Sequence, residues 1–325
     1  MTGQNLPEVQ IDAVVIGRNE GARLVACLTS LRPHLRQIIY VDSGSSDGSV
    51  QRAKDLGAEV VALDMSMPFT AARARNAGLA RLFQQEQNPQ ALVQLIDGDC
   101  MLDPGWIATA SAFLTQHPEI AVVCGRRRER FPQATLYNAL CDQEWNTPIG
   151  EAKACGGDAL MRLEALRQVA GFRPDLIAGE EPEMCLRLRQ EGWKIWRLDA
   201  EMTLHDAQMT RFSQWWKRSR RAGHAFAEGA ALHGKTPERH WRTETRRAIV
   251  WGAILPLLVL LCALVTPWAL LGLLIYPLQV LRLSRRIGLT GAVFSVLGKF
   301  AESQGVIEYW WNRLRGRRRG ILEYK

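Results

Sequence analysis

Two carboxylates separated by a single glycine, Asp97 and Asp99, are the first feature of this sequence that could carry chemistry. They follow an apolar run that ends in Leu95 and Ile96. Both acids can approach a hard divalent cation through oxygen, so the pair predicts a site for Mg²⁺ or Mn²⁺. The ion would bridge the phosphates of a ligand. Spacing alone leaves open an ordinary Asp-Gly turn whose acids face water.

A second polar segment, V-D-S-G-S-S-D-G at residues 41–48, has the composition of a tight loop that leads into a helix. Ser46 and Asp47 are explained by capping of that helix. Asp42 closes the preceding apolar run, where it could accept hydrogen bonds from a nucleobase or ribose. The sequence contains neither G-x-x-x-x-G-K-[ST] nor G-x-G-x-x-G, which argues against P-loop NTPases and dinucleotide enzymes.

A third acidic pair, Glu180-Glu181, precedes a predicted helix at 183–191. Pro182 suits the first helical turn and leaves Glu181 at the N-cap, where the helix dipole favours the ionised carboxylate. The same field lowers its basicity, so a role as general base would require desolvation to raise it again. The alternative is that both acids only cap the helix.

The elements that must position these acids form a repeating pattern. Unbroken apolar runs typical of buried strands occupy 12–16, 37–41, 59–63 and 91–96. Helix signals occupy 21–31, 49–56 and 70–83. The alternation predicts an α/β fold with a mostly parallel, Rossmann-like sheet, in which ligands bind beyond the carboxyl ends of the strands.

The segment 248–281 contains no charged residue. It is too long for one straight membrane helix, and Thr266-Pro267 breaks it, so we expect two helices at about 249–265 and 267–281. Arginines flank both ends, which by the positive-inside bias places both ends in the cytosol. A re-entrant or in-plane hairpin remains open, and a buried hairpin of a soluble protein is the remaining alternative. The flanking arginines are Arg246, Arg247, Arg282, Arg285 and Arg286.

The net charge of +8 is unevenly placed, with much of the excess after Arg211. The run 211–221, with Trp215 and Trp216, predicts a basic amphipathic helix that could hold a diphosphate through Arg218 and Arg221, lie on the membrane, or do both. The adjacent hydrophobic segment favours anionic membrane lipids over nucleic acid as the partner of the arginine-rich tail. That tail carries Arg313, Arg315, Arg317, Arg318 and Arg319.

Two further observations concern the compartment. The seven cysteines form no C-x-x-C pair and no zinc-type spacing, so buried free thiols in a reducing compartment are expected. Residues 1–9 lack the basic start and apolar core of a secretory signal. We therefore expect an inner-membrane protein whose catalytic domain faces the cytosol.

The order of these motifs resembles the family 2 glycosyltransferases, which have the GT-A fold. In chain order the motifs are V-V-I-G-R-N-E, V-D-S-G-S-S-D-G, A-R-A-R-N-A-G, D-G-D, G-G-D and G-E-E-P-E-M-C-L-R-L. The resemblance covers about residues 11–224. Within the family, the chain is similar to membrane-associated bacterial enzymes of surface or exopolysaccharide assembly. Each motif is short, and their combination carries the specificity.

The resemblance implies a set of site residues. Glu20 and Asp42 would hold the nucleoside, Arg73 and Asn76 would shape the donor pocket, and Asp99, with Asp97 nearby, would hold the metal. Gly156, Gly157 and Asp158 would lie where donor sugar and acceptor meet. The base in similar enzymes is the second acid of a Glu-Asp pair, here Glu180-Glu181, so the base would be a glutamate that reaches one methylene further. His205 would lie near the metal or diphosphate.

The function predicted from these residues is an inverting transfer of a sugar from a nucleotide diphosphate sugar to a saccharide or lipid-linked acceptor, with Glu181 as base. The alternatives are a nucleotidyltransferase and a membrane scaffold that binds a nucleotide sugar without turning it over. We expect a GT-A catalytic domain at 1–245, a membrane hairpin at 246–286 and a basic amphipathic tail at 287–325.

Overall fold

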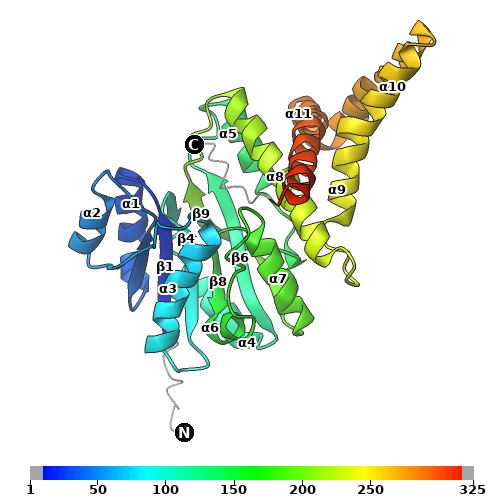
Figure 1. Cartoon of the computed structure of the whole chain (residues 1–325). Helices are drawn as coiled ribbons and strands as arrows, with labels where there is room; N and C mark the ends of the chain where they lie inside the picture. The colour runs from blue at the N-terminus through cyan, green and yellow to red at the C-terminus, as the bar shows by residue number, and fades with distance from the viewer. Residues whose placement is uncertain (1–9, 317–325) are drawn as a thin grey trace. The chain divides into compact units, whose positions relative to one another are not determined.

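A computed structural model describes residues 10–316 of the chain. The chain divides into two compact units, which are described separately. Among the described residues, the first unit joins residues 10–176 to 180–208, and the second joins residues 177–179 to 209–316. Figure 1 shows the sheet of the first unit and the helices of the second.

The first unit is built on one mixed sheet. Its strands are β1 (Ile11–Gly17), β2 (Ile38–Asp42), β3 (Glu59–Ala62), β4 (Leu92–Asp97), β5 (Cys100–Leu102), β6 (Ile120–Glu129), β7 (Gly150–Ala152), β8 (Ala159–Arg162) and β9 (Lys194–His205). Within the described residues the spatial order is β3-β2-β1-β4-β8-β6-β9-β5, and β7 pairs with β9. The strands β3, β2, β1 and β4 are parallel, whereas β8 runs antiparallel to both of its neighbours.

The helices of the first unit connect these strands. They are α1 (Ala22–Leu31), the 3₁₀ turn η1 (Arg32–His34), α2 (Ser49–Asp55), α3 (Ala71–Gln85), α4 (Trp106–Gln116), α5 (Leu136–Glu144), α6 (Leu163–Gln168) and α7 (Glu180–Gln190). The four strands and three helices predicted for the first hundred residues are confirmed to within about two residues. The predicted helix at 183–191 begins earlier, at Glu180, so Glu181 lies inside the first turn instead of at the N-cap.

Close packing of helix on strand fixes the core of this unit. Every residue of β2 is buried, as its unbroken apolar run predicted. Helix α3 approaches β1 at Gly78, where an added Cβ would lie 2.4 Å from a methyl group of Val14. Because Gly78 has no side chain, the helix can lie directly on the sheet. An extra methyl group in such a closely packed core would force neighbouring side chains to move.

The order of the strands creates one topological switch point. From β1 the chain moves outward through β2 and β3, then returns to place β4 on the other side of β1. In open α/β sheets ligands bind beyond the carboxyl ends of the strands at such a point. The sheet therefore directs a ligand to the edge at which β1, β2 and β4 end.

The second unit is helical. It contains α8 (Phe212–His233), α9 (Arg242–Ile249), the π-helical turn η2 (Val250–Ile254), α10 (Leu255–Ala263), the 3₁₀ segment η3 (Pro267–Leu274) and α11 (Ile275–Leu314). The break predicted at Thr266-Pro267 is present. The second helix is longer than the predicted 267–281, because α11 continues through a kink at Gly288, where φ is 74°.

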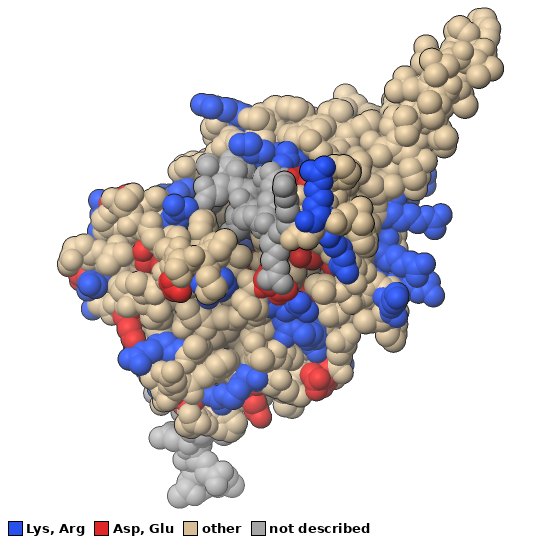
Figure 2. Space-filling view, viewed as in Figure 1, with Lys and Arg blue, Asp and Glu red and all other residues tan. Residues whose placement is uncertain are grey.

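Two helical segments of this unit are long and apolar enough to cross a membrane. They are Arg242–Ala263, with a mean hydropathy of 1.8, and Pro267–Leu314, with a mean hydropathy of 1.2. Their apolar side chains are exposed, as at Leu257 (57%) in the first segment and Trp268 (78%) in the second. In Figure 2 the projecting end of this hairpin, near α10, shows neither basic nor acidic residues. These helices are candidate membrane spans by length and composition.

Small residues bring α8 and α11 together. A Cβ added to Gly305 would lie 2.0 Å from the carbonyl oxygen of Arg220, and one added to Gly223 would lie 2.0 Å from that of Glu302. The Arg220 guanidinium also pairs with Glu308 at 2.9 Å. Close backbone approach at glycines is the packing that membrane helices use as well.

Candidate active site

Asp42 and Asp97 end the two strands that flank β1. Asp42 is in register with Gly17, and Asp97 with Ile16. The two acids therefore lie at the same edge of the sheet, beside the switch point. The sequence predicted this placement from the ends of the apolar runs.

The Asp42 carboxylate organises the loop that follows it. It accepts hydrogen bonds from the backbone N–H groups of Gly44 (3.0 Å) and Ser45 (2.9 Å) and from the Tyr40 hydroxyl (3.0 Å). Glu20, at the end of the loop after β1, pairs with Arg23 at 2.6 Å. Both predicted nucleoside-binding acids thus lie at this edge, Asp42 at the end of β2 and Glu20 on the loop after β1.

Arg75 joins Asp97 to Glu180. Its guanidinium lies 2.9 Å from an Asp97 oxygen and 2.9 Å from a Glu180 oxygen, and its side chain is 4% exposed. Burial opposes ionisation of Asp97, but Arg75 and Arg127 outweigh it and hold the pKa of this carboxyl below its usual value. The D-G-D turn and the start of α7 are thereby linked through one arginine, although Asp97 and Glu180 are 83 residues apart in the sequence.

Arg127 provides a second guanidinium at the same place. It lies 3.1 Å from Asp97 and 3.3 Å from Asp158. Asp158 in turn accepts a hydrogen bond from the Asp97 backbone N–H at 3.0 Å. A Cβ added to Gly157 would lie 2.9 Å from an Asp97 oxygen, so the G-G-D segment packs directly against the D-G-D turn.

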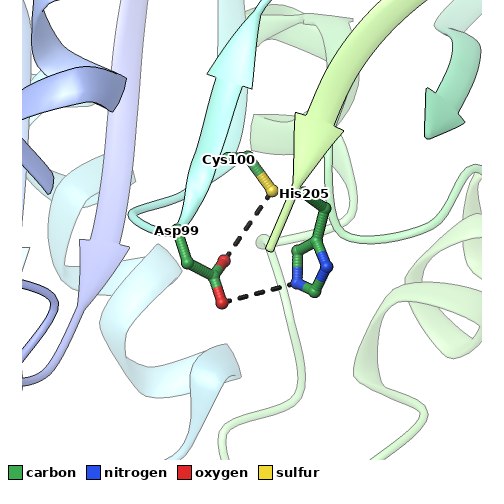
Figure 3. A group of neighbouring side chains, drawn as sticks. All are labelled: Asp99, Cys100 and His205. Atoms are coloured by element: carbon green, nitrogen blue, oxygen red, sulfur yellow. Dashed lines mark hydrogen bonds and ion pairs between the residues drawn. The ribbon is translucent and has the colours of Figure 1, made fainter. Parts of the chain in front are cut away.

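Asp99 lies beside His205, as Figure 3 shows. The Nε2 atom of His205, at the end of β9, is 3.4 Å from Asp99 Oδ2, and the Cys100 thiol is 3.7 Å from Asp99 Oδ1. Burial, together with the nearby Arg127 guanidinium, lowers the pKa of His205. The imidazole is therefore neutral at pH 7 and has a lone pair for a ligand.

The donor set at Asp99 fits a divalent metal ion. One carboxylate oxygen, one imidazole nitrogen and the Cys100 sulfur lie within 4.8 Å of one another. Carboxylate and neutral imidazole together suit Mn²⁺ and similar first-row ions. Of the predicted metal ligands, Asp99 is thus part of this group, whereas both oxygens of Asp97 are taken by arginines.

Glu181 points into a buried pocket of two thiols. Its Oε1 atom accepts hydrogen bonds from the Cys155 N–H (2.7 Å), the Cys155 thiol (3.0 Å) and the Cys185 thiol (2.9 Å). The side chain is buried, and this burial raises the pKa of the carboxyl, although these hydrogen bonds oppose the shift. A raised pKa is the property that a carboxylate base needs near neutral pH.

Two other predicted residues hydrogen-bond to backbone groups, and a third, Gly156, has a backbone conformation that favours glycine. Arg73 donates to the carbonyl oxygens of Asp64, Met67 and Pro68, and Asn76 bonds both the N–H and the carbonyl of Phe172. Gly156 has φ 81°, a value that other residues rarely adopt, next to Gly157. These contacts shape the loops of the first unit, and their role toward a donor stays a prediction.

The predicted diphosphate-binding arginines, Arg218 and Arg221, lie on α8 in the second unit. Arg221 donates to the Ile177 carbonyl at 3.0 Å within that unit. Of the predicted basic tail, Arg317, Arg318 and Arg319 lie outside the described residues.

Arg75 and Arg127 were not predicted as site residues from the sequence. A signal for Arg75 exists, since helical spacing puts it on the same face of α3 as Ala72 and Leu79, which is the buried face. A charged residue on a core-facing stripe requires a buried partner. For Arg127 the only signal in the sequence is the strand periodicity of β6, and this periodicity does not identify the acids with which the arginine pairs.

Part of the chain matches a known protein family. Residues 12–165 match the model of the glycosyl transferase family 2. The succinoglycan biosynthesis protein ExoA of Rhizobium meliloti (strain 1021) is 22% identical over 215 residues, which cover 61% of this chain and 64% of that protein. The match thus spans less than two thirds of the length of this relative.

Solved structures share the fold. The mannosyltransferase PcManGT from Pyrobaculum calidifontis, in complex with GDP-Man and Mn²⁺, superposes with a TM-score of 0.62 at 16% identity, covering 94% of this chain and 88% of its own. Glucosyl-3-phosphoglycerate synthase from Mycobacterium tuberculosis, with Mn²⁺ and UDP, gives a TM-score of 0.50 at 21% identity over 70% and 80% of the two chains. These similarities show a GT-A-like fold.

Proposed function

The chain is a family 2 glycosyltransferase through its segment 12–165, and from this premise we propose that it transfers a sugar from a nucleotide diphosphate sugar to an acceptor hydroxyl with inversion. The observation that carries the proposal is the meeting of Asp42, Asp97 and Asp99 at one edge of the sheet, at the switch point where such folds bind ligands. The related fold that binds GDP-Man and Mn²⁺ supports the same donor class.

In this proposal Asp99 and His205 hold Mn²⁺ or Mg²⁺. Such an ion, when bound, would neutralise negative charge on the donor diphosphate as it leaves. Glu20 and Asp42 would bind the nucleoside. The guanidinium groups of Arg75 and Arg127 keep Asp97 ionised next to the proposed position of the donor phosphates. The absence of a side chain at Gly157 lets the G-G-D segment, the proposed donor-sugar region, lie directly against Asp97, since a Cβ there would lie 2.9 Å from the carboxylate.

Glu181 is the proposed general base. Its carboxylate would accept the proton of the acceptor hydroxyl as that oxygen attacks the anomeric carbon and the nucleoside diphosphate leaves. The two thiols and the N–H of Cys155 orient it, and burial raises its pKa toward neutrality. Its neighbour Glu180 is held by Arg75 and is less available for this task.

The test is a panel of nucleotide sugars scored for metal-dependent release of nucleoside diphosphate. Asp99→Asn should abolish release, while Asp55→Asn, which changes an exposed acid on α2 of the same unit, should not. Release of pyrophosphate instead would indicate a nucleotidyltransferase. Absence of both donor hydrolysis and transfer with every donor would indicate a binding scaffold.

The acceptor is proposed to be lipid-linked, on the cytosolic face of a membrane. The second unit contains an apolar groove of about 460 Å³ between its candidate membrane helices, with Leu260, Leu273 and Phe300 among its walls. Arginines flank the uncharged segment on both sides, which favours cytosolic ends and contact with anionic lipids. The exopolysaccharide role named for the ExoA relative is consistent with such an acceptor.

A comparison of acceptors tests this second part. The same saccharide, free or attached to a long-chain lipid, should be used with a lower KM in the lipid-linked form. Leu260→Gln should raise that KM, whereas Leu264→Gln, at an 83% exposed position outside the groove, should not. Equal use of both acceptors by the unaltered protein would refute a lipid-linked substrate without affecting the assignment of donor and metal.

A further inference from the structure

Cys155, Glu181 and Cys185 form a compact cluster of metal-ligating atoms. The two sulfur atoms are 3.8 Å apart, and each lies within 3.0 Å of Glu181 Oε1. All three side chains are buried. The residues come from two separate segments, the loop before β8 and the first two turns of α7, which hold the cluster between them.

The geometry of this cluster resembles a zinc site. Two thiolates bound to one tetrahedral zinc ion at about 2.3 Å each lie about 3.8 Å apart, which is the sulfur–sulfur distance observed here. The two sulfur–oxygen distances are those of hydrogen bonds, so the carboxylate would have to shift slightly to admit an ion. Two sulfurs and one oxygen leave a fourth tetrahedral position open.

The charge of the cluster also permits a cation. Burial raises the pKa of both thiols, so they are neutral at pH 7 and Glu181 supplies the one negative charge when it is ionised. A divalent ion that displaces both thiol protons to solvent leaves two thiolates, one carboxylate and one dication. The net charge is again minus one, so occupancy adds no net charge to the buried site, and binding should strengthen as pH rises.

We infer that Cys155, Cys185 and Glu181 form a binding site for Zn²⁺ or a similar thiophilic divalent cation, distinct from the site at Asp99 and His205. An ion bound there occupies the carboxylate of Glu181. If Glu181 is the base, as the proposed function states, this occupancy inhibits transfer. The cluster would then make the enzyme sensitive to zinc through its base, while Mn²⁺, which prefers oxygen and nitrogen ligands, would not compete effectively for the thiols.

The experiment uses Co²⁺ as a spectroscopic substitute for Zn²⁺ in the detergent-solubilised full chain, with Mn²⁺ present to occupy the first site. Thiolate ligands give Co²⁺ charge-transfer absorption that oxygen and nitrogen ligands do not. We expect these bands in the unaltered protein and in Cys100→Ser, which removes the one thiol near Asp99, and their loss in the double variant Cys155→Ser/Cys185→Ser. Bands that persist in the double variant, or are absent from the unaltered protein, overturn the site.

A second measurement needs no variant. Zn²⁺ should slow alkylation of Cys155 and Cys185, followed by mass spectrometry, but not that of the buried Cys141 outside the cluster. Equal alkylation with and without Zn²⁺ would mean that the thiols serve only as hydrogen-bond donors to Glu181, which overturns the inference.

Inhibition separates this inference from the proposed function. In Cys185→Ser the Zn²⁺ concentration for half-inhibition, relative to that variant's own rate, should rise by about tenfold or more. Thiolate bands without any inhibition of the unaltered protein would uphold the metal site and refute Glu181 as the base. Inhibition that is unchanged in Cys185→Ser would place the inhibitory ion elsewhere and overturn the site.

Discussion

The ion network around Arg75 allows a quantitative prediction. Replacing Arg75 by Met removes a 4% exposed guanidinium from Asp97 and Glu180, whose side chains are 28% and 12% exposed. Breaking a buried pair costs about 3–5 kcal/mol. Because Asp97 keeps Arg127 at 3.1 Å, the lower end, about 3 kcal/mol, applies. Most of this free-energy cost then comes from the carboxylate of Glu180, which stays buried after losing its cationic partner.

Glu180→Gln should therefore rescue the Arg75→Met variant. In Arg75→Met/Glu180→Gln the orphaned charge is gone, so about 2 kcal/mol of the loss should return. For a unit of about 200 residues, each kcal/mol corresponds to roughly 2–4 °C in Tm. Arg75→Met should therefore lower the Tm of the first unit by about 6–12 °C, and the double variant should regain about 4–8 °C.

Differential scanning calorimetry of the detergent-solubilised protein measures these shifts. The matched control is Arg81→Met on the same helix, since Arg81 is 46% exposed and pairs with Glu59 at the surface. Such a surface pair is worth about 0–1 kcal/mol. The reasoning is refuted if Arg75→Met and Arg81→Met have the same effect, or if the double variant is no more stable than Arg75→Met alone.

Four further predictions concern catalysis and packing. Glu181→Gln should lower kcat by about 10²–10⁴-fold. Because burial raises the pKa of Glu181, the midpoint at which the initial rate rises with pH should lie above the pKa of an exposed glutamate. Cys185→Ala should move this rise to higher pH, since it removes a donor to the carboxylate, and an unmoved pH profile would exclude Glu181 as the titrating base. His205→Ala should raise the Mn²⁺ concentration for half-maximal rate by about 10–100-fold; an unaltered metal titration would remove His205 from the site. Gly305→Ala should destabilise the second unit by about 1–3 kcal/mol, because its Cβ would lie 2.0 Å from a backbone oxygen of α8. Gly298→Ala, whose Cβ would have its nearest contact at 3.6 Å, should be tolerated. Equal thermal stability of the two variants would contradict the packing.

Much of the first unit could be predicted from the sequence because its strands are buried on both faces. The runs that end at Asp42 and Asp97 contain no polar interruption except Gln94, so their ends are well marked. Parallel strands then bring those ends to one edge, whatever the details of the loops. This is why the acids could be placed together from the sequence, while Arg75 required the structure.

Other features depend on contacts that a sequence pattern does not encode. Helix α7 begins at Glu180 and carries Glu181 inside its first turn, where the side chain meets the thiols of Cys155 and Cys185. Pro182 marks a helix start only to within a residue or two. The length of α11 was also not predicted. The charged residues that begin at Arg282 suggested a helix end there, but the chain stays helical beyond them and passes through a kink at Gly288.

The charges around Asp97 favour the proposed cation at this edge of the sheet. Asp97, Asp158 and Glu180 share the guanidinium groups of Arg75 and Arg127, so three acids meet two bases. Asp99 and Glu129 both face His205, whose pKa is lowered, so the imidazole supplies no compensating positive charge at pH 7. Negative charge gathered in a poorly solvated place is costly unless a cation compensates it. A divalent ion at Asp99 would offset this excess, and a diphosphate would then add its own charge beside two arginines that are already in place.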